Sequence, residues 1–252
     1  MSMEMEWFDL EIRICDTAQQ LGESAAKHVA GVLRECIAAN GGARIVLSTG
    51  ASQFETLDAL RGEDIDWQKV EMFHLDEYVG LPETHNASFR KYLKERFLAH
   101  VDMGKVHFVD GTLEGMRQLS EEVRRMPVDI ALIGIGENAH IAFNDPPADF
   151  DTREAFIVVD LDESCKRQQV GEGWFASVED VPRQAVSMTV HQILQCRRIV
   201  SCVPRGVKAA AMRALLAAPG PDRNVPASVL KAHGDFILYM DRDSAGEVLT
   251  LS

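Results

Sequence analysis

The chain has 252 residues, of which 46% are hydrophobic, and a formal net charge of −13. This length suits one large α/β domain, and we expect a single domain over residues 1–252. So acidic a chain repels phosphate backbones and anionic lipid, which argues against nucleic-acid and membrane partners. A small anionic substrate held by a few local donors remains compatible with this charge.

The N-terminal residues and the cysteines both indicate the cellular compartment of the protein. Residues 1–10 are acidic and lack the basic and apolar regions of a signal peptide, and no stretch approaches the ~18 to 20 apolar residues of a transmembrane helix. We therefore expect a cytoplasmic protein. Five scattered cysteines without a CxxC pair predict reduced thiols rather than a disulfide or zinc framework: Cys15, Cys36, Cys165, Cys196 and Cys202.

Short apolar runs alternate with amphipathic stretches along the chain. The first helix has apolar residues on one face between Leu21 and Ile37, with Thr17 as N-cap and Gly41 as its stop signal. The remaining pattern predicts strands at 44–48, 70–75, 106–109, 128–134, 156–161, 198–203 and 236–240, and helices at 52–60, 88–101, 113–125 and 207–216. The predicted fold class is α/β, an open, mostly parallel sheet flanked by helices on both faces (Rossmann-like, three layers).

Three polar, glycine-containing loops directly follow predicted strands, at residues 48–53, 74–82 and 134–146. Ligands of open parallel sheets bind beyond the carboxyl ends of the strands, so we expect these loops to converge. The first contains Ser48, Thr49, Gly50, Ala51 and Ser52, whose hydroxyls and backbone amides would suit an anion. It is not a P-loop, and an ordinary strand–helix turn with Ser52 as N-cap is the alternative.

The other two loops carry titratable groups. Asp76 and Glu77 are either solvated acids or an acid/base site, and on a strand they would point to opposite faces. His140 is either a proton shuttle, its tautomer fixed by a carboxylate such as Asp145, or a structural histidine. No second His or Cys lies at ligand spacing nearby, so we expect no metal. Lys208 could bind a phosphate or simply be solvated.

The second and third loops carry a resemblance to a known family. Residues 73–82, followed by His85 and Ser88, resemble one signature of the glucosamine-6-phosphate deaminases, and residues 134–146 resemble another. The stretch Ser48-Thr-Gly50 resembles their phosphate loop, and the likeness covers roughly residues 15 to 245. The related 6-phosphogluconolactonases share the glycine–histidine loop but lack the long run through residue 82.

The resemblance implies a substrate, a reaction and residue roles. The protein would isomerise and deaminate glucosamine 6-phosphate to fructose 6-phosphate and ammonium without a metal or organic cofactor. Asp76 would move the proton between C2 and C1, and His140 would open the sugar ring with help from Asn138 and Asp145. The substrate-binding set would be Ser48 to Ser52, Glu77, Gly136, Ala139, Arg167 and Lys208.

The chain departs from the family pattern at several of these positions. Asn138 stands where the family usually has an aspartate, Ala139 and Ala51 where it has glycines, and Asp145 where it has a glutamate. Arg167 is the nearest candidate for the family's phosphate-binding arginine. Two alternative functions remain open on the sequence: a sugar-lactone hydrolase of the 6-phosphogluconolactonase type, and a non-catalytic sugar-phosphate-binding protein. A monomer or a homo-oligomer is expected.

Overall fold

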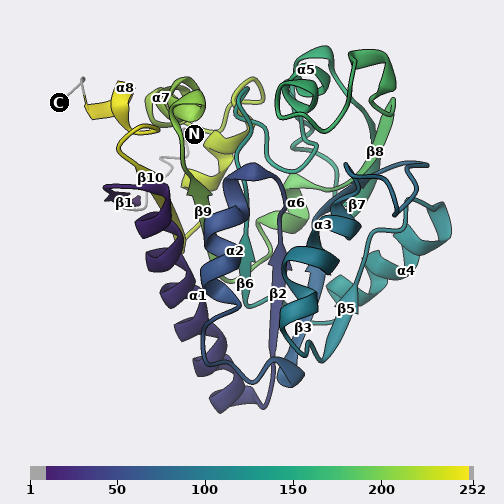
Figure 1. The fold of residues 1–252 in the computed structure, drawn as a ribbon, viewed down its shortest axis with the longest axis vertical. Helices are drawn as coiled ribbons and strands as arrows, with labels where there is room; N and C mark the ends of the chain where they lie inside the picture. Colours follow the sequence, from purple (N-terminus) through teal and green to yellow (C-terminus); the bar gives the residue numbers. More distant parts are fainter. Residues whose placement is uncertain (1–9, 250–252) are drawn as a thin grey trace, which may run out of the picture.

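Seven parallel strands form the central sheet of the computed structural model, which describes residues 10–249 (Figure 1). Residues 1–9 lie outside the described part, so the prediction that the chain begins without a signal peptide falls almost entirely on residues that the structure does not describe. The strand order is β1-β10-β9-β6-β2-β3-β5. The strands are β1 (Glu11–Cys15), β2 (Ala43–Leu47), β3 (Val70–His74), β5 (Lys105–His107), β6 (Ile130–Leu132), β9 (Ile199–Val203) and β10 (Phe236–Asp241).

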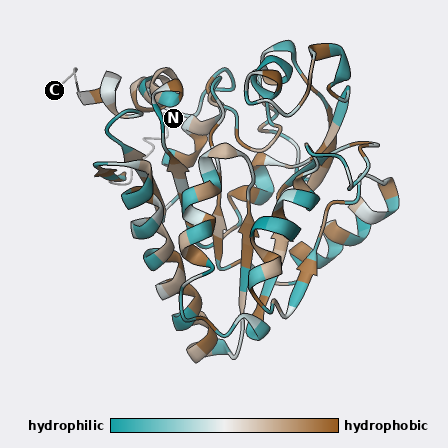
Figure 2. Cartoon of the chain, in the orientation of Figure 1, coloured by the Kyte–Doolittle hydropathy of each residue, from teal (hydrophilic) through white to brown (hydrophobic). Residues whose placement is uncertain are grey.

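Helices cover both faces of this sheet, and each face has its own apolar core. One face packs against α1 (Ala18–Asn40), α2 (Phe54–Leu60) and α3 (Phe89–Arg96). The other packs against α4 (Leu113–Arg124), α6 (Val190–Ile193) and α7 (Ala209–Ala217). The inner strand β2 is buried at every residue, and the hydrophobic colouring of the central strands in Figure 2 follows from that position. The predicted three-layer α/β class is confirmed.

Helix α1 shows why its ends lie where the sequence predicts them. The Thr17 side chain accepts a hydrogen bond from the Gln20 amide, so it caps the first turn. At the other end Gly41 adopts φ 80°, a left-handed conformation that favours glycine, and its amide bonds the Ile37 carbonyl. The predicted cap and the predicted stop are both confirmed.

A second, smaller sheet was not predicted. It is antiparallel, in the order β4 (Asp76–Tyr78), β8 (Gln184–Met188) and β7 (Phe156–Asp160). The strand predicted at 156–161 therefore forms, but outside the parallel sheet. The strand predicted at 70–75 ends at His74, and Asp76, predicted to lie in a loop, opens the separate strand β4. The helix α5 (Glu163–Gly171), also unpredicted, packs beside this sheet.

The chain order places a topological switch between β2 and β6. From β2 the chain runs outward through β3 and β5, then returns to β6 on the other side of β2. The two loops that leave these strands are joined there, because Ser48 Oγ accepts a hydrogen bond from the Gly134 amide at 3.1 Å. Such a switch opens a crevice at the carboxyl ends of the strands. These ends lie at the top of Figure 1.

The remaining elements complete the outline. The C-terminal part holds the 3₁₀ segment Pro226–Ala232 and the short helix α8 (Gly246–Leu249). Further one-turn 3₁₀ segments are Ala51–Gln53, Trp67–Lys69, Leu98–His100, Val178–Asp180 and Gly206–Lys208. Within residues 10–249, every helix is too short or too polar to cross a lipid bilayer.

Candidate active site

A cavity of about 550 Å³, its open mouth included, lies in the crevice at the carboxyl ends of the strands. It is lined by nine residues that the sequence singles out: Ser48, Thr49, Gly50, Ala51, Ser52, Asp76, Gly136, His140 and Lys208. The three predicted loops therefore do converge on one cavity. Residues from the third loop, from α5 and the residue after it, and from the starts of β4 and α3 complete its walls: Leu75, Phe89, Gly134, Ile135, Ala142, Phe143, Gln168, Gln169 and Glu172.

Two carbonyl groups in the loop after β2 bond to side chains that lie outside the cavity lining. The Gly50 carbonyl accepts a hydrogen bond from Tyr92 Oη at 3.0 Å, and the Ala51 carbonyl accepts one from Arg205 Nη1 at 3.1 Å. Neither donor side chain belongs to the lining. Because N–H and C=O of a trans peptide point in opposite directions, the amides of Ala51 and Ser52 face the other way. This leaves backbone donors for an anion.

Glycine is required at one position of this loop only. Gly50 has φ 96°, which L side chains rarely adopt, whereas Ala51 starts a 3₁₀ turn with helical backbone. Alanine therefore fits at position 51 without backbone strain, although the family usually has glycine there. Ser52 lies within the 3₁₀ turn and is not an N-cap, so the structure does not bear out the alternative of a turn capped by Ser52.

Asp76 and Glu77 point to opposite sides of β4, as strand geometry predicts. Asp76 is only 6% exposed and lines the cavity, and burial together with the nearby Glu77 charge raises its pKa well above the ordinary 3.8. Glu77 lies outside the lining. It accepts hydrogen bonds from Ser88 Oγ and from the amides of Phe89 and Arg90, so it holds the start of α3. Its predicted contact with substrate has no support in this geometry.

His140 occupies space that only a glycine leaves free. A Cβ atom built on Gly136 would lie 2.2 to 2.5 Å from the His140 ring, so any larger residue there would displace the imidazole. The neighbouring Ala139 has φ 63°, in the left-handed region, which costs roughly 1–2 kcal/mol for a residue with a Cβ. This backbone explains why the related family usually has glycine at that position.

Asn138 and Asp145 support His140 from outside the cavity lining. Asp145 Oδ1 lies 3.0 Å from His140 Nδ1, at ion-pair distance. Asn138 donates from Nδ2 to Asp145 Oδ1 at 3.2 Å and accepts from the His140 amide through Oδ1. Burial alone would raise the pKa of Asp145, but His140 and Asn138 together lower it below its usual value. The shorter aspartate therefore does reach His140.

Lys208 supplies the cation that the sequence assigned to this site. It is buried and lines the cavity, and burial lowers the pKa of its ammonium, with Arg205 acting in the same direction and Glu172 and Glu137 opposing it. The Glu172 carboxylate in the lining is itself fixed by Gln168 Nε2 at 2.7 Å and Trp174 Nε1 at 2.9 Å. A negative charge thus stands in the same cavity as the lysine.

Arg167 does not lie at the cavity. It is exposed on α5 and contacts Glu163 at 4.0 Å, so it does not replace a phosphate-binding arginine. The wall formed by Gln168, Gln169 and Glu172 escaped sequence reasoning because α5 was not predicted. Its N-cap offers a signal: Asp162 accepts a hydrogen bond from the Cys165 amide at 2.6 Å, an arrangement typical of a helix start.

Comparison with known proteins places the chain in a family. Residues 16–238 match the model of the glucosamine-6-phosphate isomerases/6-phosphogluconolactonase, and the chain belongs to this family. Among its relatives is the glucosamine-6-phosphate deaminase of Streptococcus uberis, 34% identical over 224 residues, covering 86% of this chain and 92% of that protein. The deaminase of Staphylococcus epidermidis is 33% identical over 237 residues, covering 89% and 96%.

Solved structures agree with this assignment. A monomeric glucosamine-6-phosphate deaminase superposes with a TM-score of 0.86 at 30% identity, covering 94% of this chain and all of that one. A 6-phosphogluconolactonase from Shewanella baltica superposes with a TM-score of 0.76, covering 92% and 98%. At 18% identity the second likeness concerns the fold alone.

Proposed function

We propose that this protein is an enzyme that converts glucosamine 6-phosphate and water to fructose 6-phosphate and ammonium. The observation that carries the proposal is a single cavity lined by a buried carboxylate, Asp76, a loop-held imidazole, His140, and a buried ammonium, Lys208. Relatives that cover more than four fifths of the chain are named for this activity. We further propose that it acts in the cytoplasm, as a monomer or a homo-oligomer.

The substrate phosphate would bind between the loop after β2 and Lys208. That loop offers backbone amides and the hydroxyls of Ser48, Thr49 and Ser52, and the lysine offers the positive charge. Charge-assisted hydrogen bonds of this type are stronger than neutral ones, which suits a dianionic group. Phosphate binding at this end would leave the sugar carbons extending toward Asp76 and His140.

His140 would catalyse opening of the pyranose ring. An imidazole can accept the proton of the C1 hydroxyl and return a proton to the ring oxygen, which releases the aldehyde. Asp145 would fix the orientation of the ring from the opposite edge, since it contacts Nδ1 and leaves Nε2 for the substrate. Asn138 would hold Asp145 in place.

Asp76 would then act as the base of the isomerisation. It would remove the proton from C2 of the open-chain aminosugar and deliver a proton to C1, which moves the double bond and leaves an imine at C2. Water adds to that imine, its oxygen becomes the C2 carbonyl, and ammonium leaves. The raised pKa of Asp76 brings this carboxylate nearer to the working range of a general base.

Product analysis with three substrates tests the proposal. The full chain, incubated with glucosamine 6-phosphate, should release ammonium and fructose 6-phosphate in equal amounts. A chain that instead hydrolyses 6-phosphogluconolactone, releasing no ammonium, would be a lactonase. A chain that binds glucosamine 6-phosphate and turns over neither compound would be a binding protein. The rate with galactosamine 6-phosphate in the same assay measures how strongly the enzyme discriminates between the two configurations of the C4 hydroxyl.

A further inference from the structure

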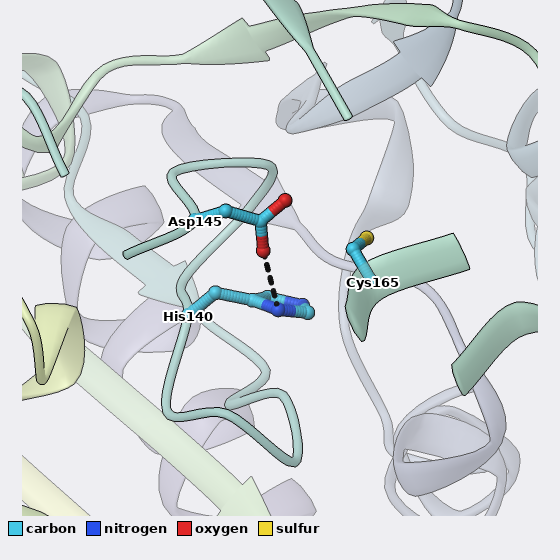
Figure 3. A group of neighbouring side chains, drawn as sticks. All are labelled: His140, Asp145 and Cys165. Atoms are coloured by element: carbon cyan, nitrogen blue, oxygen red, sulfur yellow. Dashed lines mark ion pairs between the residues drawn. The ribbon is translucent and has the colours of Figure 1, made fainter. Parts of the chain in front are cut away.

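We propose that His140, Asp145 and Cys165 form a binding site for a zinc-class divalent cation. One nitrogen of His140, one carboxylate oxygen of Asp145 and the Sγ of Cys165 all lie within 4.8 Å of one another. Figure 3 shows the three side chains, with the Asp145 carboxylate against the imidazole and Cys165 on the neighbouring helix. The cysteine is 25 residues from His140 in sequence, so ligand spacing did not reveal it.

Two atoms of the group lack the hydrogen bonds that their burial demands. His140 is only 9% exposed, yet its Nδ1 makes no properly aligned hydrogen bond although Asp145 Oδ1 lies 3.0 Å away. Asp145 Oδ2 is also buried without a well-aligned hydrogen bond, although the Asp162 amide and the Cys165 thiol interact with this carboxylate. Buried polar atoms normally have well-aligned partners, so an imidazole, a carboxylate and a thiol in contact without aligned hydrogen bonds suit a cation that all three groups share.

The other cluster of this kind in residues 10–249 is already satisfied by protein cations. Glu71, His107 and Glu122 also lie within ligand distance of one another. However, the Glu71 carboxylate pairs with Arg44 at 2.7 Å and with Lys105 at 3.2 Å. These bonds, with that from His107, lower the pKa of Glu71 to about 2 in spite of its partial burial. A metal would have to displace them, so that cluster is a structural ion network.

The donor set selects the metal. A thiolate, an imidazole and a carboxylate suit Zn²⁺ or its spectroscopic substitute Co²⁺, whereas Mg²⁺ and Ca²⁺ prefer oxygen ligands throughout. With bonds of about 2.0 to 2.3 Å, tetrahedral ligand atoms are roughly 3.3 to 3.8 Å apart. Ligand atoms up to 4.8 Å apart would therefore need to approach one another by up to about 1.5 Å. Binding releases the Cys165 thiol proton to solvent, and the cation with two anionic ligands is neutral overall.

The metal would separate the catalytic histidine from Asp145, the residue that orients its ring. Bonding to Nδ1 would draw the imidazole from its present contact with Asp145, and the cation would lie behind the ring. This consequence rests on the proposed function: Zn²⁺ should slow ammonium release, and a chelator should restore it. The binding itself does not depend on that function, because it concerns only the three side chains.

Cobalt titration of the chelator-treated full chain tests the site. We expect one Co²⁺ per chain and a thiolate-to-cobalt charge-transfer band in the near ultraviolet. Cys165→Ser should abolish the band, and Asp145→Asn should weaken Co²⁺ and Zn²⁺ binding by at least about tenfold. Cys36→Ser, at a more exposed thiol on α1, should keep both the band and the affinity. Thermal unfolding confirms that each variant is folded.

The outcomes separate the two claims. A band that survives in Cys165→Ser, or an affinity unchanged in both Cys165→Ser and Asp145→Asn, would overturn the metal site. An absent band in the parent chain would do the same. Co²⁺ binding with the expected band in a chain that releases no ammonium from glucosamine 6-phosphate would uphold the site and refute the proposed activity.

Discussion

Asn138 donates a hydrogen bond from its side-chain amide to Asp145 Oδ1 at 3.2 Å. The Asn138 amide donates a hydrogen bond to Asp145, whereas an ionised aspartate at position 138 would repel it. Asn138 therefore helps to keep Asp145 ionised beside His140. Asn138→Asp would place two carboxylates at this distance and remove the donor. We expect it to lower the free energy of unfolding at neutral pH by about 1–3 kcal/mol.

The penalty of Asn138→Asp should shrink as the pH falls, because one of the two carboxylates then binds a proton and donates a hydrogen bond to the other. Urea unfolding at neutral and acidic pH checks both expectations. Asn138→Ala is the control, since it removes the donor without adding charge. Equal stability of the parent and Asn138→Asp at neutral pH would show that the amide of Asn138 has no such role.

Asp76→Asn should stabilise the fold at neutral pH. In the unfolded chain Asp76 loses its proton near its ordinary pKa of 3.8, whereas burial and Glu77 raise its pKa in the folded chain. The folded state therefore holds the proton more tightly, and stability falls as the pH rises from 3.8 through the folded pKa. The neutral side-chain amide of the Asp76→Asn variant does not titrate, so the variant does not lose stability in this way. Thermal unfolding above pH 7 should show a higher midpoint than the parent, and a lower midpoint would contradict the electrostatic account.

Lys208→Ala should weaken binding of the substrate phosphate. A hydrogen bond to a charged group contributes about 1.5–3 kcal/mol, so we expect KM for glucosamine 6-phosphate to rise roughly ten- to a hundredfold with a smaller change in kcat. Lys166→Ala is a matched control, because this lysine lies on α5 outside the cavity lining. A KM that stays within twofold would remove Lys208 from the phosphate site.

Glu172→Gln should have the opposite effect. The carboxylate stands in the same cavity as Lys208 and opposes the phosphate charge, so its neutral analogue should lower KM by a few-fold, on the order of 1 kcal/mol at an effective dielectric constant near 20. The gain should decrease at high salt. Steady-state kinetics at two ionic strengths check this, with Glu163→Gln, on α5 outside the cavity lining, as the control. A raised KM would mean that Glu172 binds the substrate.

Much of the site could be predicted because it depends on local sequence rules. Glycine and polar residues after predicted strands pointed to three loops, which contain Ser48, Asp76 and His140. The topology of a parallel sheet predicted that these loops converge. Side chains alternate between the two faces of a strand. This alternation predicted that only one of Asp76 and Glu77 would face the cavity.

The rest depends on contacts between distant segments. The small antiparallel sheet pairs Asp76 with Ser187 and Phe156 with Met188, and no local pattern specifies such partners. Strand β1 was missed because it lies at an edge with mostly exposed residues, so it lacks an apolar run. Cys165 approaches His140 only because α5 packs over the third loop.

The turnover of Asp76→Asn tests the central claim most directly, that a buried carboxylate moves the C2 proton. At saturating glucosamine 6-phosphate we predict a loss of ammonium release of about 10²- to 10⁴-fold, the usual contribution of a general base. Binding of inorganic phosphate should stay within about twofold, because the proposed phosphate ligands are the loop after β2 and Lys208 rather than Asp76. Ammonium release within tenfold of the parent, by a folded variant, would contradict the account.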